Sequence, residues 1–204
     1  MDAVKPANAS MPAIRLRSYE KSHSCGIILV AKNDGVWYVA EMLQNDKTFG
    51  RPDGYVPAVD IGAKGEMLPG ETERQTAMRE LFEETGLQGF EPVGDFKATE
   101  GPYLMSRWDN GRPTDKVEKT ITYYLSIVPY YVLEEIRLSR EHIAYSVNPL
   151  SMVIGKLNVT SPKRAEILAE VREYLLTRDI KESKERRSLD DVLANYRLIF
   201  GPEP

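Results

Sequence analysis

The chain has 204 residues, a formal net charge of −4, a single cysteine and 42% hydrophobic residues. This length predicts one domain with a sizeable core. The slightly acidic balance excludes a global field that would draw the chain to DNA or to an anionic membrane. One cysteine excludes an internal disulfide, and no apolar stretch approaches the roughly 20 residues of a membrane span. Because the first 21 residues lack the apolar core of a secretory signal, a cytoplasmic location is the default expectation.

The N-terminal part of the chain predicts a tail followed by a β-hairpin. Residues 1–21 contain prolines, alanines and alternating charges, and we expect a flexible tail there. Two β-rich runs follow, at 24–31 and 36–43. The turn Asn33-Asp34-Gly35 between them tolerates positive φ, which favours a hairpin. Residues 45–60 are then expected to form a loop.

The clearest predicted helix spans residues 72–85. Thr72 and Gln75 have the spacing of a capping box, and Gly86 stands where a left-handed residue ends a helix. Further strands are expected at about 91–98, 119–128 and 143–147, where β-branched and aromatic residues are frequent. Residues 101–116 are expected to form a loop between the first two of these strands.

The last third of the chain is predicted to be mainly helical. We expect a short helix over 149–157, a long one over 162–180 and a final one over 188–200. Strands and helices that do not strictly alternate predict an α+β fold in which helices clasp a mixed sheet. The expected organisation is a tail over 1–21, one domain over 22–180 and a helical extension over 181–204. The extension could cover the core or form a dimer, so monomer and homodimer both stay open.

Three carboxylates carry the chemistry of the predicted 72–85 helix. Glu80, Glu83 and Glu84 stand at i, i+3 and i+4, so they share one helix face and repel one another. A hard divalent cation would offset that repulsion, because Mg²⁺ prefers carboxylate and water oxygens and bridges to substrate phosphates. Arg79 and Glu71 could lock the orientation of these carboxylates. A solvated, charged helix face is the alternative interpretation of the three glutamates alone.

The wider spacing around these glutamates resembles the signature of the Nudix hydrolase family. That signature is Gly, five residues, Glu, seven residues, Arg-Glu-apolar, one residue, Glu-Glu, one residue and Gly-apolar. Its fixed positions are all matched here, by Gly65, Glu71, Arg79-Glu80-Leu81, Glu83-Glu84 and Gly86-Leu87. The resemblance implies an α/β/α sandwich. It also implies Mg²⁺-dependent hydrolysis of a nucleoside diphosphate linked to another moiety, with Mn²⁺ as an alternative cofactor.

The same resemblance implies a metal site and a set of catalytic residues. The implied metal ligands are Gly65 through a nearby backbone carbonyl, Glu80, Glu83, Glu84 and Glu141. The implied catalytic residues are Arg79, Glu83, Glu84 and Glu141. Which of the glutamates acts as the base stays open. His142, beside Glu141, is expected to be structural.

Three further segments resemble the animal-type asymmetrical diadenosine tetraphosphate hydrolases within this family. They are 24–28, 119–125 and 136–145, and the likeness runs from about residue 22 to 177. It implies that Lys64 and Lys119 face the polyphosphate and that Tyr103 stacks on adenine. Tyr174 is a second candidate for stacking, although its place on the apolar stripe of its helix favours core packing.

The chain departs from this branch just before Lys64. The branch usually has an aromatic residue and two prolines there, whereas this chain has 59–63 as Val-Asp-Ile-Gly-Ala after a longer loop. The substrate therefore stays open. Diadenosine tetraphosphate, cut to ATP and AMP, is the first expectation. An RNA 5′ end, for pyrophosphohydrolysis or decapping, and a diphosphoinositol polyphosphate are the alternatives.

Two observations bear on these alternatives. Arg107, Arg112 and Lys116 in the predicted 101–116 loop could form a basic track for RNA, but Asp109 and Asp115 dilute its charge. A nucleotide-sensing module without turnover is the remote alternative, and the intact glutamates argue against it.

Overall fold

The computed structural model describes residues 18–45, 58–109 and 112–179. The strands are β1 (Glu20–Asn33), β2 (Val36–Gln44), β3 (Val59–Asp60), β4 (Ala63–Glu66), β5 (Lys97–Asp109), β6 (Arg112–Ile127) and β7 (His142–Pro149). The helices are α1 (Glu73–Thr85), α2 (Tyr130–Glu134), α3 (Leu150–Thr160) and a further helix over 162–179. The expected 188–200 helix, most of the 1–21 tail and most of the 45–60 loop lie outside the described residues.

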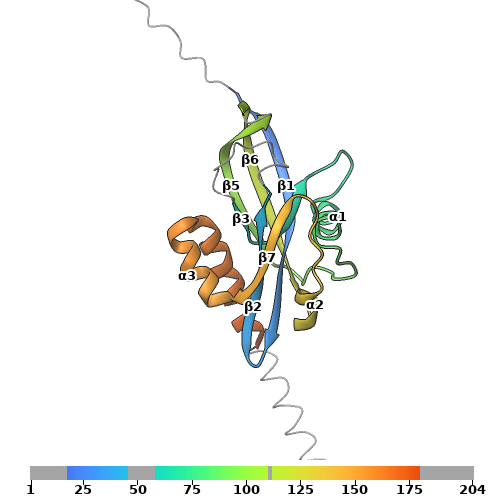
Figure 1. The fold of residues 1–204 in the computed structure, drawn as a ribbon, viewed down its shortest axis with the longest axis vertical. Coiled ribbons are helices and arrows are strands. Elements are labelled where there is room, and N and C mark those ends of the chain that lie inside the picture. The colour runs from blue at the N-terminus through green and yellow to red at the C-terminus, as the bar shows by residue number, and fades with distance from the viewer. Residues whose placement is uncertain (1–17, 46–57, 110–111, 180–204) are drawn as a thin grey trace, which may run out of the picture.

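The strands form one mixed sheet between two layers of helices. Its order is β3-β2-β1-β6-β5, with β4 paired to β1 and β7 paired to β2, and β1 runs parallel to β6. Helices α1 and α2 lie on one side of the sheet and α3 lies on the other (Figure 1). The predicted α+β class, with a mixed sheet clasped by helices, is confirmed.

The predicted N-terminal hairpin is confirmed, and it opens into a fork. Asn33 pairs with Val36 around Asp34 and Gly35, both at positive φ. Residues 30–33 of β1 pair with β2, but residues 24–27, nearer the N-terminus of β1, pair with β4 instead. The far end of β2 pairs with β3. The β3–β4 unit therefore fills the gap between the diverging strands. Its two strands were not predicted, because they are short and contain no periodic apolar pattern.

Two glycines allow this close insertion. A Cβ on Gly26 would clash with the carbonyl oxygen of Ala63, and a Cβ on Gly62 would clash with the carbonyl oxygen of Ile27. Any side chain at either position would have to push backbone away. The path of β4 along β1 therefore depends on glycine at both positions.

The β5–β6 hairpin differs from the sequence expectation. Strands were predicted at 91–98 and 119–128 with a loop over 101–116, but the structure pairs β5 and β6 along nearly their whole lengths. Gly101 and Pro102 are typical of a loop. They lie instead in a register shift between Glu100 and Tyr103, which is where a strand tolerates a proline. Residues 91–96 are not in a strand.

The predicted helices are confirmed with small changes of boundary. In α1, Thr72 Oγ1 accepts a hydrogen bond from the backbone N–H of Gln75, while Gln75 Oε1 accepts one from that of Thr72. Gly86 ends α1 in the left-handed conformation at φ 72°. The α3 and 162–179 helices match the expected 149–157 and 162–180. The single-turn α2 was missed, because five residues are too few for a periodic pattern.

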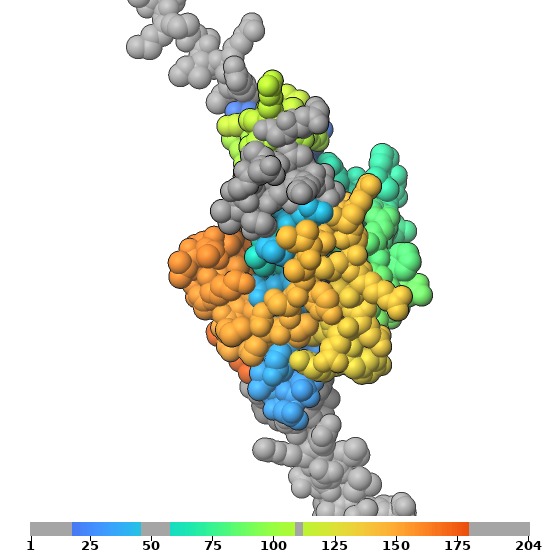
Figure 2. Space-filling model, viewed as in Figure 1, coloured from blue at the N-terminus to red at the C-terminus, as the bar shows by residue number. Residues whose placement is uncertain are grey.

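The core is divided by the sheet. On the α3 side, Ile28, Val30 and the inner residues of α3 and the 162–179 helix pack together. On the α1 side, Ile27, Leu29 and residues of α1 and α2 do so. The space-filling view shows α3 and β7 flanking β2, with the β5–β6 tip at the opposite end from the β1–β2 turn (Figure 2). Among the described helices, none combines the length and apolarity needed to cross a membrane.

We expect Gly155→Ala to stabilise the protein. Gly155 is exposed in the interior of α3, and nothing lies within 4 Å of an added Cβ. Alanine should raise the free energy of unfolding by about 0.5–1 kcal/mol, because it restricts the unfolded chain and favours the helix. Urea unfolding would measure the difference. Gly35→Ala is the matched control: it has the same open space but φ +79°, and should destabilise.

Candidate functional site

Helix α1 carries the three glutamates of the sequence pattern toward the fork between β1 and β2. Glu80 and Glu84 are buried, whereas the side chain of Glu83 is 54% exposed. The helix is placed by its apolar residues Ala77 and Leu81, which pack against β1 and β4 residues in the core of that side. The capping box and Gly86 fix where α1 begins and ends, so the three carboxylates keep their common orientation.

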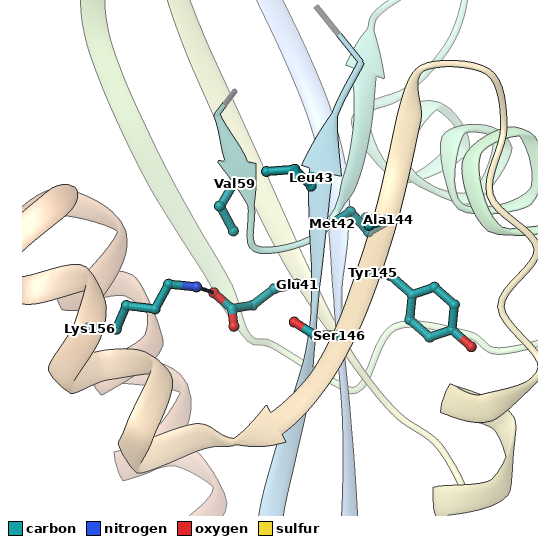
Figure 3. A pocket seen from close by; sticks show the side chains of 8 residues that line it. All are labelled: Glu41, Met42, Leu43, Val59, Ala144, Tyr145, Ser146 and Lys156. Carbon is teal, nitrogen blue, oxygen red and sulfur yellow. Dashed lines mark hydrogen bonds and ion pairs between the residues drawn. The ribbon is translucent and has the colours of Figure 1, made fainter. Parts of the chain in front are cut away.

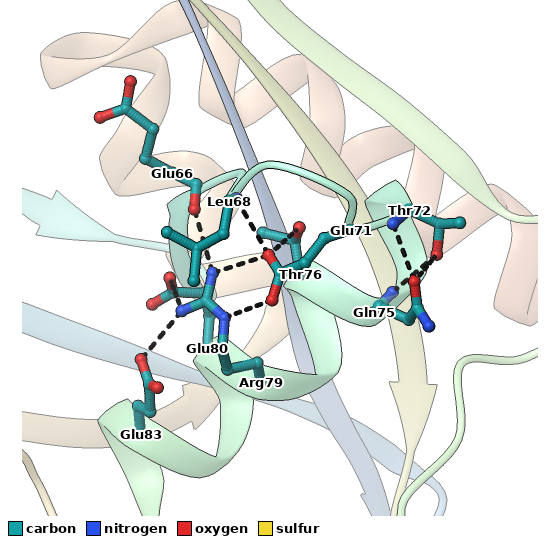
Figure 4. A network of polar contacts seen from close by, with 9 residues as sticks. All are labelled: Glu66, Leu68, Glu71, Thr72, Gln75, Thr76, Arg79, Glu80 and Glu83. Atoms are coloured by element: carbon teal, nitrogen blue, oxygen red, sulfur yellow. Dashed lines mark hydrogen bonds and ion pairs between the residues drawn. The ribbon is translucent and has the colours of Figure 1, made fainter.

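Arg79 links the carboxylates on the solvent side of this face (Figure 4). Its guanidinium donates two hydrogen bonds to Glu71, at 2.7 and 3.1 Å. It also donates to Glu80 Oε1 at 2.5 Å, to Glu83 Oε2 at 3.0 Å and to the carbonyl oxygen of Glu66 at 3.0 Å. One planar cation thus holds the loop before α1 and two turns of the helix together.

The positive charge of Arg79 reduces the repulsion between the clustered glutamates that the sequence predicts. Hydrogen bonds from Arg79, Thr76 and the backbone of Leu68 lower the pKa of Glu71 to about 2. The hydrogen bond to Glu71 in turn raises the pKa of Arg79 above its ordinary value. Part of the compensation that we expected from a cation is therefore supplied by the protein itself, on the exposed side of the cluster.

Gly65 in β4 provides the place where the Glu80 carboxylate lies. A Cβ on Gly65 would clash with the carboxylate carbon and both oxygens of Glu80. Only glycine lets that carboxylate rest against the β4 backbone. Burial raises the pKa of Glu80, and the hydrogen bond and charge of Arg79 oppose the rise.

The neighbouring residue in β4 holds Glu84. The backbone N–H of Lys64 donates to Glu84 Oε2 at 2.9 Å. Burial raises the pKa of Glu84 from its ordinary 4.5 to about 7, although the charges of Lys64 and His142 oppose the rise. The Lys64-Gly65 dipeptide of β4 therefore supports two of the three motif glutamates of α1.

Glu141 approaches the same group from the loop that precedes β7. The backbone N–H of Asn45 donates to the carbonyl oxygen of Glu141 at 2.6 Å, and the Asn45 side chain donates to that of Arg140 at 2.8 Å. The negative charge of Glu141 contributes to the raised pKa of Glu80. The structure thus brings this residue near the glutamates of α1, 57 or more positions earlier in the chain.

Two lysines and a tyrosine predicted to meet the substrate lie on the α3 side of the sheet. Lys119 donates to Ser22 Oγ at 3.3 Å, and burial lowers its pKa. The charges of Glu66 and Glu80 oppose that fall, and those of Lys64 and Arg107 add to it. Tyr103 is the cross-strand partner of Lys119, so the two side chains share a face.

The structure does not bring Tyr174 to this group. Its ring packs edge-on against Phe96, with centroids 5.5 Å apart. Phe96 precedes Lys97, which pairs with Tyr124, five positions along β6 from Lys119. That separation is about 17 Å at 3.4 Å per residue. Packing on the core explains the position of Tyr174, as its apolar stripe indicated.

Asp60 is a feature that sequence reasoning did not assign to the site. This carboxylate is 1% exposed and belongs to β3, inside the fork. Its Oδ2 accepts from Gln44 Nε2 at 2.8 Å, from Lys64 Nζ at 2.8 Å and contacts His142 Nε2 at 3.3 Å. Burial would raise its pKa, but Lys64, His142 and Arg164 together hold the pKa well below the ordinary value. The one available signal was the departure of 59–63 from the aromatic residue and two prolines that are usual before Lys64.

A pocket elsewhere on the sheet is separate from these residues (Figure 3). It has a volume of about 210 Å³ and lies between β2, β7 and α3. Buried Glu41 faces it and accepts from Lys156 Nζ at 2.9 Å and from Asn148 Nδ2 at 3.1 Å. Because its polar groups are paired with one another, this pocket shows no chemistry of its own.

The glutamate set suits a hard divalent cation by its donor chemistry. Within the described ranges, no three His, Cys, Asp or Glu side chains already converge as a metal centre. The carboxylates are held separately instead, Glu80 and Glu83 by Arg79 and Glu84 by the β4 backbone. Adjacent β4 residues support two of these carboxylates, Gly65 that of Glu80 and Lys64 that of Glu84, and carboxylate oxygens are the donors that Mg²⁺ prefers.

Comparison with known proteins gives both a family match and close relatives over part of the chain. The profile of the NUDIX domain family matches residues 24–171. Two curated proteins named bis(5′-nucleosyl)-tetraphosphatase (asymmetrical) are similar. The one from Sus scrofa is 37% identical over 90 residues, and the one from Rattus norvegicus is 39% identical over 82. Each match covers 40% of this chain, which spans about half the length of these curated relatives.

Solved structures show the same fold. A binary complex of C. elegans Ap4A hydrolase has a TM-score of 0.56 and 19% identity, covering 76% of this chain and 98% of the other. A second structure of C. elegans Ap4A hydrolase has a TM-score of 0.52 and 18% identity with the same coverage. At such identities the likeness concerns the arrangement of strands and helices.

We expect Gly65→Ala to keep the fold but to displace Glu80. The new methyl group would meet only the end of a flexible side chain, so the free energy of unfolding should change by about 1 kcal/mol or less. Mn²⁺ binding, measured by electron paramagnetic resonance, should be lost. Gly26→Ala is the contrast, because its Cβ meets backbone, and it should cost more than about 2 kcal/mol. Unchanged Mn²⁺ binding in Gly65→Ala would remove Glu80 from the ligand set.

We expect Glu84→Gln to stabilise the metal-free protein at high pH. A folded pKa of about 7 against 4.5 means that wild-type stability falls as pH rises from about 4.5 through about 7. Glutamine still accepts from the Lys64 N–H but does not ionise, so the variant should be more stable by about 1–3 kcal/mol at pH 8. At pH 4.5 the two should be nearly equal. Chemical unfolding in a chelator across this range measures the difference, and parallel curves would contradict the expectation.

Proposed function

The chain belongs to the NUDIX family, and we propose that it is a divalent-metal-dependent hydrolase of nucleotides linked through a polyphosphate. The observation that carries this proposal is the meeting of motif glutamates with cations. Glu80 and Glu84 are held by β4, and the charges of two partly buried lysines act on this pair: that of Lys64 opposes the raised pKa of Glu84, and that of Glu80 opposes the lowered pKa of Lys119. Carboxylates that hold a cation, next to ammonium groups that attract an anion, form the arrangement that a polyphosphate requires.

The residues of the chain would divide the chemistry between them. Mg²⁺ or Mn²⁺ held by Glu80, Glu83, Glu84, Glu141 and a carbonyl near Gly65 would polarise the phosphate and lower the pKa of a water. Lys64 and Lys119 would neutralise the polyphosphate, and Tyr103 would stack on a nucleobase. Arg79 would keep the carboxylates oriented through its hydrogen bonds to Glu71, Glu80 and Glu83.

The proton released by the attacking water needs an acceptor. Glu83, Glu84 and Glu141 are the candidates on this structure. We favour Glu84, because burial raises its pKa to about 7, near neutral pH. In the balanced reaction, water adds across one phosphoanhydride, so one product gains the hydroxyl oxygen and the other leaves with the bridging oxygen.

Diadenosine tetraphosphate, cut to ATP and AMP, is the substrate that we place first. The similarity to two asymmetrical tetraphosphatases supports this choice, and the match with a C. elegans Ap4A hydrolase supports a common fold. The basic track that would favour RNA is weaker than the sequence suggested. Arg107 and Lys116 lie on strands β5 and β6 rather than in a loop, and Arg107 is paired with Glu20 at 3.0 Å.

A product assay tests the proposed function. The protein is incubated with Mg²⁺ and, separately, with diadenosine tetraphosphate, a 5′-triphosphorylated RNA and a diphosphoinositol polyphosphate, and the products are separated. We expect ATP and AMP from the first and little turnover of the others. Pyrophosphate or phosphate released mainly from RNA would replace the substrate while keeping the catalytic site. Turnover of none of the three would contradict the proposed substrate classes.

We expect Glu84→Gln to lower kcat by about 100-fold or more, because it removes a charged ligand or base from the reacting centre. The fold should stay intact, since the hydrogen bond from Lys64 is retained. Steady-state hydrolysis of the best substrate measures the effect. Glu41→Gln is the control: Glu41 is also buried and paired with a lysine, but lies outside the site. Near-normal turnover by Glu84→Gln would refute the proposed site.

A further inference from the structure

We propose that Asp60 is a positioning residue that holds two parts of the metal site at a fixed separation. One part is the Lys64-Gly65 segment of β4, which supports Glu80 and Glu84. The other is the loop that carries Glu141. The proposal rests on the metal site of the proposed function and adds to it a residue that the Nudix signature does not contain.

A single carboxylate oxygen makes the connection. Asp60 Oδ2 accepts hydrogen bonds from Gln44 and Lys64, each at 2.8 Å, and lies 3.3 Å from His142 Nε2. Its three partners come from the end of β2, from β4 and from the start of β7. With Asp60 itself in β3, residues of four strands meet at one atom.

The first arm of this connection runs to the glutamates of α1. The Asp60–Lys64 ion pair closes the corner between β3 and β4 around Gly62. The backbone N–H of the same Lys64 supports Glu84 at 2.9 Å, and the next residue forms the cradle for Glu80. A displacement of Lys64 would therefore move the support of both carboxylates at once.

The second arm runs to Glu141. His142 follows it in the chain, is 1% exposed in its side chain and points its Nε2 at Asp60. Gln44, another partner of Asp60, precedes Asn45, which binds the carbonyl oxygens of Arg140 and Glu141. Asn45 and Glu141, which bind each other, are therefore each next in sequence to a partner of Asp60.

Burial makes this anchor effective. Asp60 is 1% exposed, and Arg164 from the 162–179 helix stands 3.6 Å from its other oxygen. A buried hydrogen bond to an ionised group is stronger than a neutral one. Loss of the Asp60 carboxylate would leave its buried donors without their acceptor, which is costly. An aromatic residue at this position could not accept three donors. The aspartate and its partners Lys64 and His142 therefore form one connected unit.

The test compares Asp60→Asn with Glu41→Gln. Both variants neutralise a buried carboxylate that accepts from a lysine and an amide, but only the first touches Lys64 and His142. Mn²⁺ binding to the unliganded protein is measured by electron paramagnetic resonance, and unfolding is measured in urea. We expect Asp60→Asn to bind Mn²⁺ about tenfold or more weakly and Glu41→Gln to bind it as wild type does. Equal Mn²⁺ affinities in the two variants would overturn the proposal.

A pair of variants at His142 keeps the proposal testable if Asp60→Asn does not fold. Glutamine can donate to Asp60 from nearly the position of Nε2, whereas phenylalanine cannot. We expect His142→Gln to retain Mn²⁺ affinity within about threefold and His142→Phe to lose about tenfold. If the two bind alike, the contact between His142 and Asp60 does not position Glu141.

These outcomes are independent of the proposed substrate. Mn²⁺ affinity reports the arrangement of the carboxylates whether or not any nucleotide is hydrolysed. If no nucleotide is hydrolysed but Asp60→Asn binds Mn²⁺ about tenfold more weakly, the proposed substrate is wrong and the positioning role stands. If Asp60→Asn forms ATP and AMP at the wild-type rate, the proposed substrate stands and the positioning role is wrong.

Discussion

The close approach of the β4 backbone to helix α1 is the constraint on which the rest of this structure depends. Glycine at 26 and 62 lets the β3–β4 unit enter the fork between β1 and β2, and glycine at 65 leaves room for Glu80. Once β4 lies there, the Lys64 N–H meets Glu84 and the Lys64 ammonium meets Asp60. The absence of three side chains thus determines where two carboxylates and one cation are placed.

Two different arrangements compensate the concentration of negative charge. On the exposed side, Arg79 bonds Glu71, Glu80 and Glu83 with a planar group whose donors match several acceptors at once. On the buried side, Asp60 is surrounded by donors and keeps a low pKa despite its burial. Glu84 accepts a hydrogen bond from the backbone of Lys64 in β4, but burial still raises its pKa to about 7. A buried carboxylate that is costly to ionise lowers the stability of the protein, and such a cost is common at a reacting centre.

Short sequence patterns correctly predicted the helix ends and the tight turn, because these features depend on neighbouring residues. The capping box at Thr72, the Gly86 terminus and the Asp34-Gly35 turn each depend on residues within one turn, and each is confirmed. The second part of β5 and the first part of β6 were missed, because Gly101 and Pro102 gave a loop signal that cross-strand pairing overrides. Strand β3 was missed because two residues carry no periodic pattern. The Asp60 cluster joins residues 44, 60, 64, 142 and 164, and no spacing within the sequence records such contacts.

The parallel pairing of β1 with β6 has a consequence for how the molecule is made. Glu20 lies opposite Val117 and Val30 opposite Ile127, so the central strand finds its long partner only after more than half of the chain exists. Contacts this distant in sequence slow folding. The loop of Glu141 and the Arg164 end of the last described helix emerge from the ribosome later still. A nascent chain therefore carries the motif glutamates well before it can hold them in place, and full charge compensation comes only after residues 141–164 have been made.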